Sequence, residues 1–184
     1  MNDRQHLSAE ALEAAAVIGL GANLDNPLGM IREALTRLDQ TPGLSLLAVS
    51  SVYLTEPQGG PEGQNWYHNA VAFLNGGGLT PKELLRLLLA IEADLGRQRL
   101  IYCGPRVIDL DLLAWGRAVI DDPPGLILPH PRMEQRLFVM APLAELWPEW
   151  LHPVLGRRAA DLLADIPAEG QGLVRLKEAI TINI

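Results

Sequence analysis

Two aspartates separated by one residue, Asp109 and Asp111, lie in a stretch where apolar and charged residues alternate. Gly104-Pro105 is a turn signal just before this stretch, so the alternation predicts a strand that is entered from a loop. Same-face side chains on a strand are about 6.5 to 7 Å apart, because the rise is roughly 3.3 Å per residue. The two carboxylates would therefore face the same way, at a spacing that suits one or two hard cations.

An amphipathic strand with a merely solvated polar face is the alternative interpretation of this pair. Asp is depleted in strands, and two like charges at this spacing repel unless a cation neutralises them, which favours cation binding. Oxygen ligands with no His or Cys close by in sequence favour magnesium over zinc, with calcium and manganese as alternatives. Arg97, Arg99 and Arg106 supply positive charge where a magnesium-bound polyphosphate needs it. This combination is typical of phosphoryl-transfer chemistry.

The elements that must position these residues are predicted from the apolar pattern and the turn signals. In chain order they are a strand at 15–20, a helix at 27–40, strands at 44–54 and 67–74, a helix at 81–95 and a strand at 107–113. The helix at 81–95 has the clearest start, because Thr80 and Glu83 form a capping box around Pro81. A loop with several glycines and prolines at 55–64 is a candidate lid or wall of a site.

The order β-α-β-β-α-β predicts an α+β fold with a ferredoxin-like core, in which helices pack on an antiparallel sheet. Beyond it we expect a proline-rich loop at 121–131 and extra C-terminal helices at 136–146 and 156–165. The last stretch, 173–184, alternates in a way that fits either a strand or a helix.

Length, charge and cysteine content narrow the class of protein. The 184 residues suffice for one domain, expected at 15–166 between a flexible N-terminal extension at 1–14 and a C-terminal extension at 167–184. A net charge of -7 argues against binding to nucleic acid or to an anionic membrane. A single cysteine, Cys103, indicates a reducing compartment, and no apolar run approaches membrane-spanning length. We expect a cytoplasmic monomer that acts on small molecules.

Several short motifs follow one another along about residues 17 to 150. They are Gly19 to Leu24, Ser50 to Tyr53 with Thr55-Glu56-Pro57, Tyr67 to Ala70, Glu92 with Gly96 to Arg99, Gly104 to Leu113, and Pro129 to Arg132 with Arg136 and Phe138. In this order they resemble the 6-hydroxymethyl-7,8-dihydropterin pyrophosphokinase family of folate biosynthesis. The block GPR-x-IDLD-x-L with a downstream PHP is the most specific part of the resemblance.

The resemblance implies transfer of pyrophosphate from ATP to the hydroxymethyl group of the reduced pterin, with release of AMP. It implies catalytic roles for Arg97, Arg106, Asp109 and Asp111, with two Mg²⁺ ions held by Asp109 and Asp111. It implies pterin binding by Thr55, Glu56, Gln58, Tyr67, Asn69 and Phe138, with Tyr67 and Phe138 as the stacking faces. It implies ATP binding by Glu92, Arg97, Arg99, Arg106, His130 and Arg136.

Two other functions remain open at this stage. The first is a catalytically impaired homologue that binds pterin or nucleotide without turnover, which the intact aspartates and arginines disfavour. The second is a ferredoxin-like nucleic-acid-binding module, which needs strand aromatics and a basic face. An aromatic content of 5% and the acidic balance disfavour that module. Without the family, Tyr67 and Phe138 would be interpreted as ordinary core aromatics.

The chain departs from the family pattern just before Gly104. Many members of the family carry an aromatic residue there, whereas this chain has Cys103. The segment 100–103 is also less basic than the usual loop, which closes over the substrates in the family. We therefore expect closure to rely on different contacts, with Tyr102 as a candidate for the missing ring.

Overall fold

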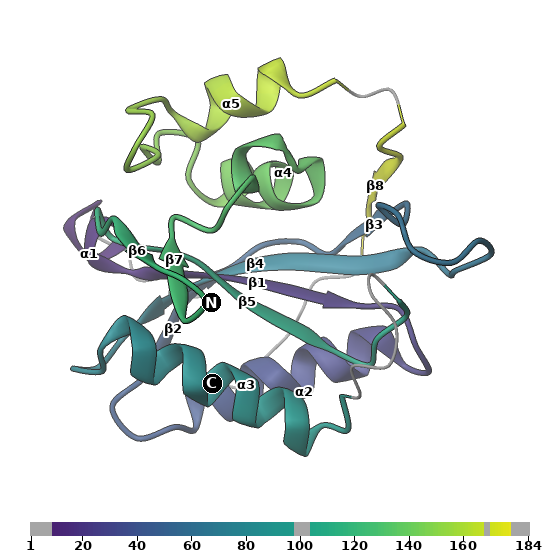
Figure 1. Ribbon diagram of the computed structural model, residues 1–184, viewed down its shortest axis with the longest axis horizontal. Coiled ribbons are helices and arrows are strands. Elements are labelled where there is room, and N and C mark those ends of the chain that lie inside the picture. Colours follow the sequence, from purple (N-terminus) through teal and green to yellow (C-terminus); the bar gives the residue numbers. More distant parts are fainter. Residues whose placement is uncertain (1–8, 98–103, 168–169, 178–184) are drawn as a thin grey trace, which may run out of the picture.

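The structure is a computed structural model that describes residues 9–97, 104–167 and 170–177. Its centre is one antiparallel sheet with helices on both faces (Figure 1). In chain order its elements are α1 (Ala9–Ala14), β1 (Ala16–Ala22), α2 (Pro27–Asp39), β2 (Ser45–Val49), β3 (Tyr53–Thr55), β4 (Tyr67–Asn75), α3 (Pro81–Asp94), β5 (Asp109–Trp115), β6 (Ile120–Asp122), β7 (Leu126–Leu128), the 3-10 turn η1 (Met133–Gln135), α4 (Leu137–Leu146), α5 (Ala159–Asp165) and β8 (Leu173–Arg175).

The strand order of the main sheet is β5-β1-β4-β3-β8, and β2 also pairs with β4. Every pairing in it is antiparallel. The predicted α+β fold with its β-α-β-β-α-β core is therefore confirmed. The core strands β1, β4 and β5 lie side by side, so residues far apart in sequence meet across the middle of the sheet.

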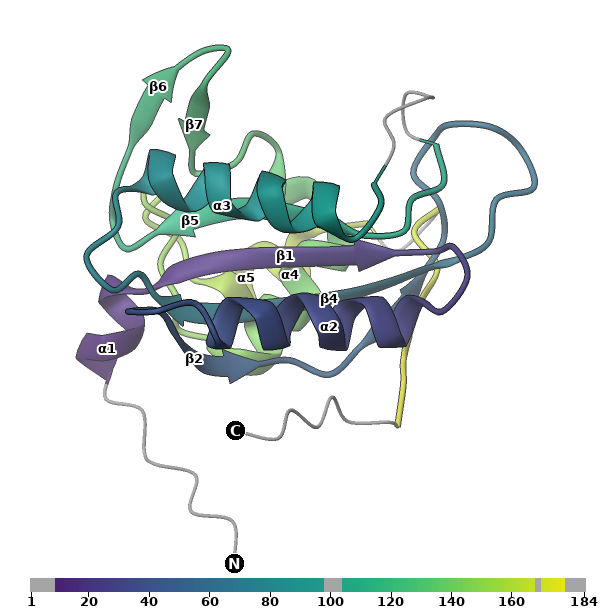
Figure 2. The same cartoon turned by 90° about the horizontal axis from the view of Figure 1, so that it is seen from below.

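The two faces of the sheet are covered by different helices. α2 and α3 lie side by side on one face, whereas α4 covers the other and α5 packs on the outer side of α4 (Figures 1 and 2). Because both faces are buried, β1 is apolar throughout, as a strand covered on both sides must be. Its Ile18 and Leu20 pack in the cluster with α2 and α3, and its Val17 packs in the cluster with α4. The sequence predicted these helices but not the face that each covers.

Two parts of the prediction needed correction. The strand predicted at 44–54 is two strands, β2 and β3, because Ser50 interrupts the pairing: its Oγ accepts from the amide of Val71, while its own amide donates to the Val71 carbonyl. The loop predicted at 121–131 contains part of the hairpin formed by β6 and β7. These short strands were not predicted from the sequence because prolines lie on either side of β7, at 123, 124 and 129, and proline is usually a sign that a strand has ended.

Helix α3 begins where the capping box predicted. The Thr80 side chain accepts from the amide of Glu83, and the Glu83 carboxylate accepts from the amide of Thr80. This fixed start matters at the other end of the helix, because the last turns of α3 carry Glu92 and lead to Arg97, beside β5. No helix in the described ranges is both long and apolar enough to span a membrane.

Candidate functional site

Asp109 and Asp111 lie on the same face of β5, the face that α4 covers. Leu110 and Leu112, which alternate with them, pack in the cluster with α2 and α3. Leu113, two residues after Asp111, packs in the cluster with α4. Side chains alternate along a strand, so both carboxylates project toward the α4 side. Both residues are half-buried, and the predicted shared face is therefore present in the structure.

Asp109 is held between two arginines. Its Oδ1 pairs with Arg97 and its Oδ2 pairs with Arg106, so each carboxylate oxygen has one guanidinium partner. Arg97 also pairs with Glu92, whose carboxylate accepts from the amide of Leu110 at 2.7 Å. Glu92 is only 2% exposed. It therefore joins the end of α3 to β5 and fixes Arg97 beside Asp109.

Asp111 has a different environment from Asp109. Its side chain makes no hydrogen bond or ion pair with another residue of the described ranges. Burial and the charge of Asp109 raise the pKa of Asp111 above its ordinary value, although His130, Arg136 and Arg97 oppose this shift. Its negative charge is thus poorly compensated, which is the situation that a bound cation relieves.

The available ligands fit Mg²⁺ better than a metal ion that is coordinated by protein side chains alone. No cluster of three or more His, Cys, Asp or Glu that could hold a metal lies in the described part of the chain. Mg²⁺ is commonly bound by one or two carboxylates while waters and phosphate oxygens complete its coordination. Asp109 and Asp111 supply such carboxylates, since an ionised carboxylate has more acceptor positions than the arginine bonds at Asp109 use.

Beside the two aspartates, β1 has glycines, so only its backbone lies on this face of the sheet. In β1, Gly21 pairs with Asp109 on one side and Asn69 on the other, while Gly19 pairs with Asp111 and Val71. A Cβ on Gly21 would lie 2.8 Å from Oδ1 of Asn69. Because neither residue has a side chain, the backbone of β1 forms a floor between β5 and β4, and the side chains of Leu113 and Asn69 lie close over it.

Asn69 and Tyr67 project from β4 to the same side as this floor, because Val71 and Phe73 continue their face into the α4 cluster. Asn69 Nδ2 donates to Oγ1 of Thr55 at 2.6 Å. The Tyr67 hydroxyl lies 3.0 Å from the carbonyl of Gly104. The guanidinium carbon of Arg106 lies 5.5 Å from the Tyr67 ring centroid. Tyr67 is thus tied to the loop that carries Arg106.

The residues predicted around α4 lie at its start. Phe138 is in the first turn, and the guanidinium carbon of Arg136 lies 5.7 Å from its ring centroid.

The amide of His130 donates to the carbonyl of Leu113 at 2.7 Å, which places His130 beside β5. The buried Nδ1 of His130 has no hydrogen-bond partner in the described structure. This polar atom would gain a partner only from a ligand or a water that reaches it.

For three of the predicted site residues, no described contact places them with the residues around Asp109 and Asp111. Gln58 is exposed on the loop after β3. The Glu56 carboxylate accepts from the amide of Gly172 at 3.1 Å and so binds another part of the chain. Arg99 lies outside the described residues, as do Tyr102 and Cys103.

Asn23 is a site residue whose role the sequence did not reveal. It is 2% exposed, its Oδ1 accepts from the amide of Arg106 at 2.8 Å, and its Nδ2 donates to the carbonyl of Asn65 at 3.1 Å. It therefore fastens the end of β1 to the two loops that flank the site. A lone asparagine directly after an apolar strand is the signal that could have drawn attention to it.

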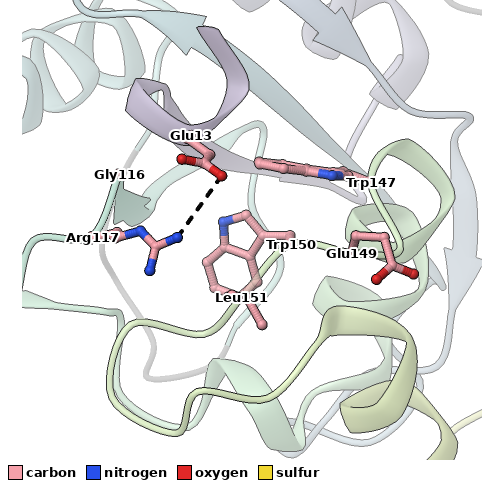
Figure 3. Close-up of a pocket in the computed structure, with 7 residues that line it drawn as sticks. All are labelled: Glu13, Gly116, Arg117, Trp147, Glu149, Trp150 and Leu151. Atoms are coloured by element: carbon pink, nitrogen blue, oxygen red, sulfur yellow. Dashed lines mark ion pairs between the residues drawn. The ribbon is translucent and has the colours of Figure 1, made fainter. Parts of the chain in front are cut away.

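A separate pocket lies at the other end of β1, where Ala16 pairs with Trp115 (Figure 3). Trp147, Trp150 and the ion pair between Glu13 and Arg117 line it. Its volume of about 30 Å³ accommodates only a few waters. It is therefore too small for an organic substrate and is unrelated to the aspartate pair.

Comparisons with known proteins agree on one family. Residues 17–148 match the family described as 7,8-dihydro-6-hydroxymethylpterin-pyrophosphokinase. A relative from Pseudomonas aeruginosa, a 2-amino-4-hydroxy-6-hydroxymethyldihydropteridine pyrophosphokinase, is 42% identical over 153 residues, which are 83% of this chain and 92% of that protein. A relative of the same name from Methylorubrum extorquens is 39% identical over 155 residues, which are 84% of this chain and 95% of that protein.

The fold is also found in solved structures. The crystal structure of Plasmodium falciparum HPPK-DHPS wild type matches with a TM-score of 0.65 and 15% sequence identity. The match covers 82% of this chain and 44% of that chain. This chain therefore spans less than half of that larger protein, and the likeness supports the fold alone.

Proposed function

The chain belongs to the 7,8-dihydro-6-hydroxymethylpterin-pyrophosphokinase family and is therefore a diphosphokinase, and we propose that it transfers pyrophosphate from ATP to the hydroxymethyl group of 6-hydroxymethyl-7,8-dihydropterin. The products are AMP and the pterin diphosphate, in folate biosynthesis. The observation that carries the proposal is the carboxylate pair of Asp109 and Asp111 beside a glycine floor, with Arg97 and Arg106 fixed around it.

Asp109 and Asp111 are the proposed ligands of two Mg²⁺ ions. When bound, these ions neutralise charge that develops around the attacked β-phosphorus of ATP. The residues themselves are held ready by the fold: the arginines fix Asp109, and the apolar neighbours of Asp111 fix its direction on β5. Positioning and electrostatics account for most of this kind of transfer, so the proposal requires no strong general base.

The arginines are proposed to bind the phosphates of ATP. Both Arg97 and Arg106 use only Nη1 in their pairs with Asp109, and a guanidinium has five N–H donors. Their side chains are 12% and 23% exposed, so each combines a fixed position with some access to a ligand. Fixed donors cost little reorganisation when charge develops on a phosphate. Arg136 adds positive charge toward α4, and the buried Nδ1 of His130 is a further polar atom there.

The pterin is proposed to bind over the Gly21 end of the glycine floor, between Tyr67 and Phe138, since Leu113 covers Gly19. A flat heterocycle needs stacking faces and in-plane polar groups. Tyr67 and Phe138 supply aromatic rings from β4 and α4, and Asn69 supplies both a donor and an acceptor. The bond from Asn69 to Thr55 fixes the direction of this amide. Selectivity for the pterin edge would follow from that fixed direction.

Product analysis tests the proposed reaction. We expect ATP with Mg²⁺ to yield AMP only when 6-hydroxymethyl-7,8-dihydropterin is present, with one pterin diphosphate formed for each AMP. Quantification of AMP and ADP by ion-exchange chromatography distinguishes the outcomes. Pterin-dependent ADP would mean attack at the γ-phosphorus and would contradict the proposal. Binding of the pterin without any product would favour the catalytically impaired homologue.

Gly21→Ala is expected to weaken pterin binding. The new Cβ would lie 2.8 Å from Oδ1 of Asn69, so the amide must move from the position that Thr55 fixes. Loss of about 1.4 kcal/mol of hydrogen bonding corresponds to about a tenfold rise in the KM for pterin. The KM for ATP should change far less. Steady-state kinetics with each substrate varied in turn provide the measurement.

Gly19→Ala is the matched control for this prediction. Its Cβ would meet Cδ1 of Leu113 at 3.2 Å, a methyl group on a rotatable side chain, and no polar group. We expect a loss of stability from overpacking with the KM for pterin within about twofold of the wild type. Equal rises in that KM for both variants would argue against a specific role of Asn69.

A further inference from the structure

The start of α4 is capped by a residue far along the chain. Arg136 occupies the N-cap position and provides no side-chain cap. Instead, Oε1 of Gln171 accepts from the amide of Leu137 at 3.0 Å. Nε2 of Gln171 donates to the carbonyl of Pro167 at 3.4 Å. Gln171 therefore satisfies one of the orphan N–H groups that every helix exposes at its start.

The next residue, Gly172, is bonded to the end of β3. The amide of Glu56 donates to the carbonyl of Gly172, and the amide of Gly172 donates to Oε2 of Glu56, each at 3.1 Å. A Cβ on Gly172 would lie 2.7 Å from Cδ of Glu56 and 3.0 Å from the Trp66 ring. A side chain at position 172 would therefore displace the Glu56 carboxylate that bonds to this residue, and Glu56 is better explained as an anchor for this segment than as a direct pterin ligand.

The following residues continue the connection. β8 pairs with β3, so that Leu173 lies opposite Thr55 (Figure 1). Arg175 bonds to Oγ of Ser51 at 2.9 Å and to the carboxylate of Glu145 in α4 at 2.7 Å. The segment 171–175 therefore contacts both β3 and α4. These are the two elements that bring Thr55 and Phe138 to the proposed pterin pocket.

We propose that Gln171 is a positioning residue for the pterin pocket. By capping α4 at Leu137, it sets the first helical turn, with Arg136 and Phe138, relative to the end of β3 that Gly172 holds. Gln171 itself touches no reacting group. This role rests on the proposed function, because it matters for activity only if Phe138 stacks on the pterin.

The test compares Gln171→Leu, which removes the acceptor, with Gln171→Glu, which keeps it and suits the positive end of a helix. Val174→Ala is the control, because Val174 is 52% exposed and lies in the same segment. We measure the Kd for the reduced pterin by fluorescence with Mg²⁺ and a non-hydrolysable ATP analogue, and hydrogen exchange at the Leu137 amide. Gln171→Leu should raise this Kd about five- to tenfold and speed exchange at Leu137, whereas the other two variants should stay within about twofold of the wild type.

Each outcome has a definite meaning. Normal pterin binding by Gln171→Leu, or equal losses in Gln171→Leu and Gln171→Glu, would overturn the positioning role while leaving the proposed function intact. A wild-type protein that binds no reduced pterin would overturn the proposed function and this role together. Faster exchange at Leu137 in Gln171→Leu alone, combined with weaker pterin binding, is the supporting result.

Discussion

Asp111→Asn is expected to reduce turnover by about a thousandfold or more while leaving the protein folded, because Mg²⁺ and its charge stabilisation contribute several kcal/mol to such a transfer. The Asp111 side chain has no hydrogen bond or ion pair within the described ranges, so asparagine leaves no described partner unpaired. Burial and the charge of Asp109 already disfavour its ionised form. The variant should therefore unfold at the same temperature as the wild type or slightly above it. Pterin-dependent AMP formation and the midpoint of thermal unfolding are the two measurements.

Asp109→Asn is the informative comparison for this prediction. Asp109 pairs with both Arg97 and Arg106, so its neutralisation leaves two partly buried arginines short of a counter-charge. We expect it to lose both activity and stability. Added Mg²⁺ with an ATP analogue should raise the unfolding midpoint of the wild type but of neither variant, since only a ligand that binds the native state stabilises it. An Asp111→Asn enzyme with near-normal turnover would exclude Asp111 as a metal ligand.

Glu92→Ala is expected to give the largest loss of stability among the site variants, about 3 kcal/mol. The carboxylate is buried, accepts from the amide of Leu110 and pairs with Arg97. Its removal leaves a buried N–H without this acceptor and a buried arginine with one fewer partner. For a chain of this length the loss corresponds to a fall of about 6 to 12 °C in the unfolding midpoint. Differential scanning calorimetry provides the measurement.

Glu92→Gln separates the two contributions. Its amide oxygen can still accept from Leu110, whereas the charge that faces Arg97 is lost. We expect it to be more stable than Glu92→Ala by about 1 to 2 kcal/mol and to show weaker ATP binding than the wild type, because Arg97 keeps Asp109 but loses the second of its carboxylate partners and is held less firmly. If Glu92→Ala lost less than about 1 kcal/mol, the joint between α3 and β5 would not depend on this side chain.

Most of the fold was predictable because its elements are locally consistent. Alternation predicted β5, the apolar pattern and turn signals predicted β4, and the capping box predicted the start of α3. The break between β2 and β3 was not predictable, because it depends on Ser50 bonding to Val71 in another strand. The face covered by α4 was also beyond a local pattern, since a helix that is apolar on most sides shows no preferred direction.

The candidate site also has features that the sequence predicted and features that it did not. The shared direction of Asp109 and Asp111 follows from the period of a strand, and the structure has it. The link from Glu92 to Leu110, the fastening by Asn23 and the cap by Gln171 all join residues distant in sequence. No local pattern encodes such pairs, because each forms only once the sheet order is set. The binding and catalytic roles assigned to individual residues stay predictions that the variants above test.

The sheet order also constrains how the protein is made. β1 is synthesised first, yet both of its neighbours, β4 and β5, come later in the chain. At roughly 5 to 20 residues per second, β5 leaves the ribosome several seconds after β1. Throughout that interval an apolar strand has at least one unpaired edge, which can recruit strands from other chains. The strand that forms the glycine floor is therefore also a point where nascent chains can aggregate. Correct folding requires that the edges of β1 do not pair with other chains before β5 is synthesised.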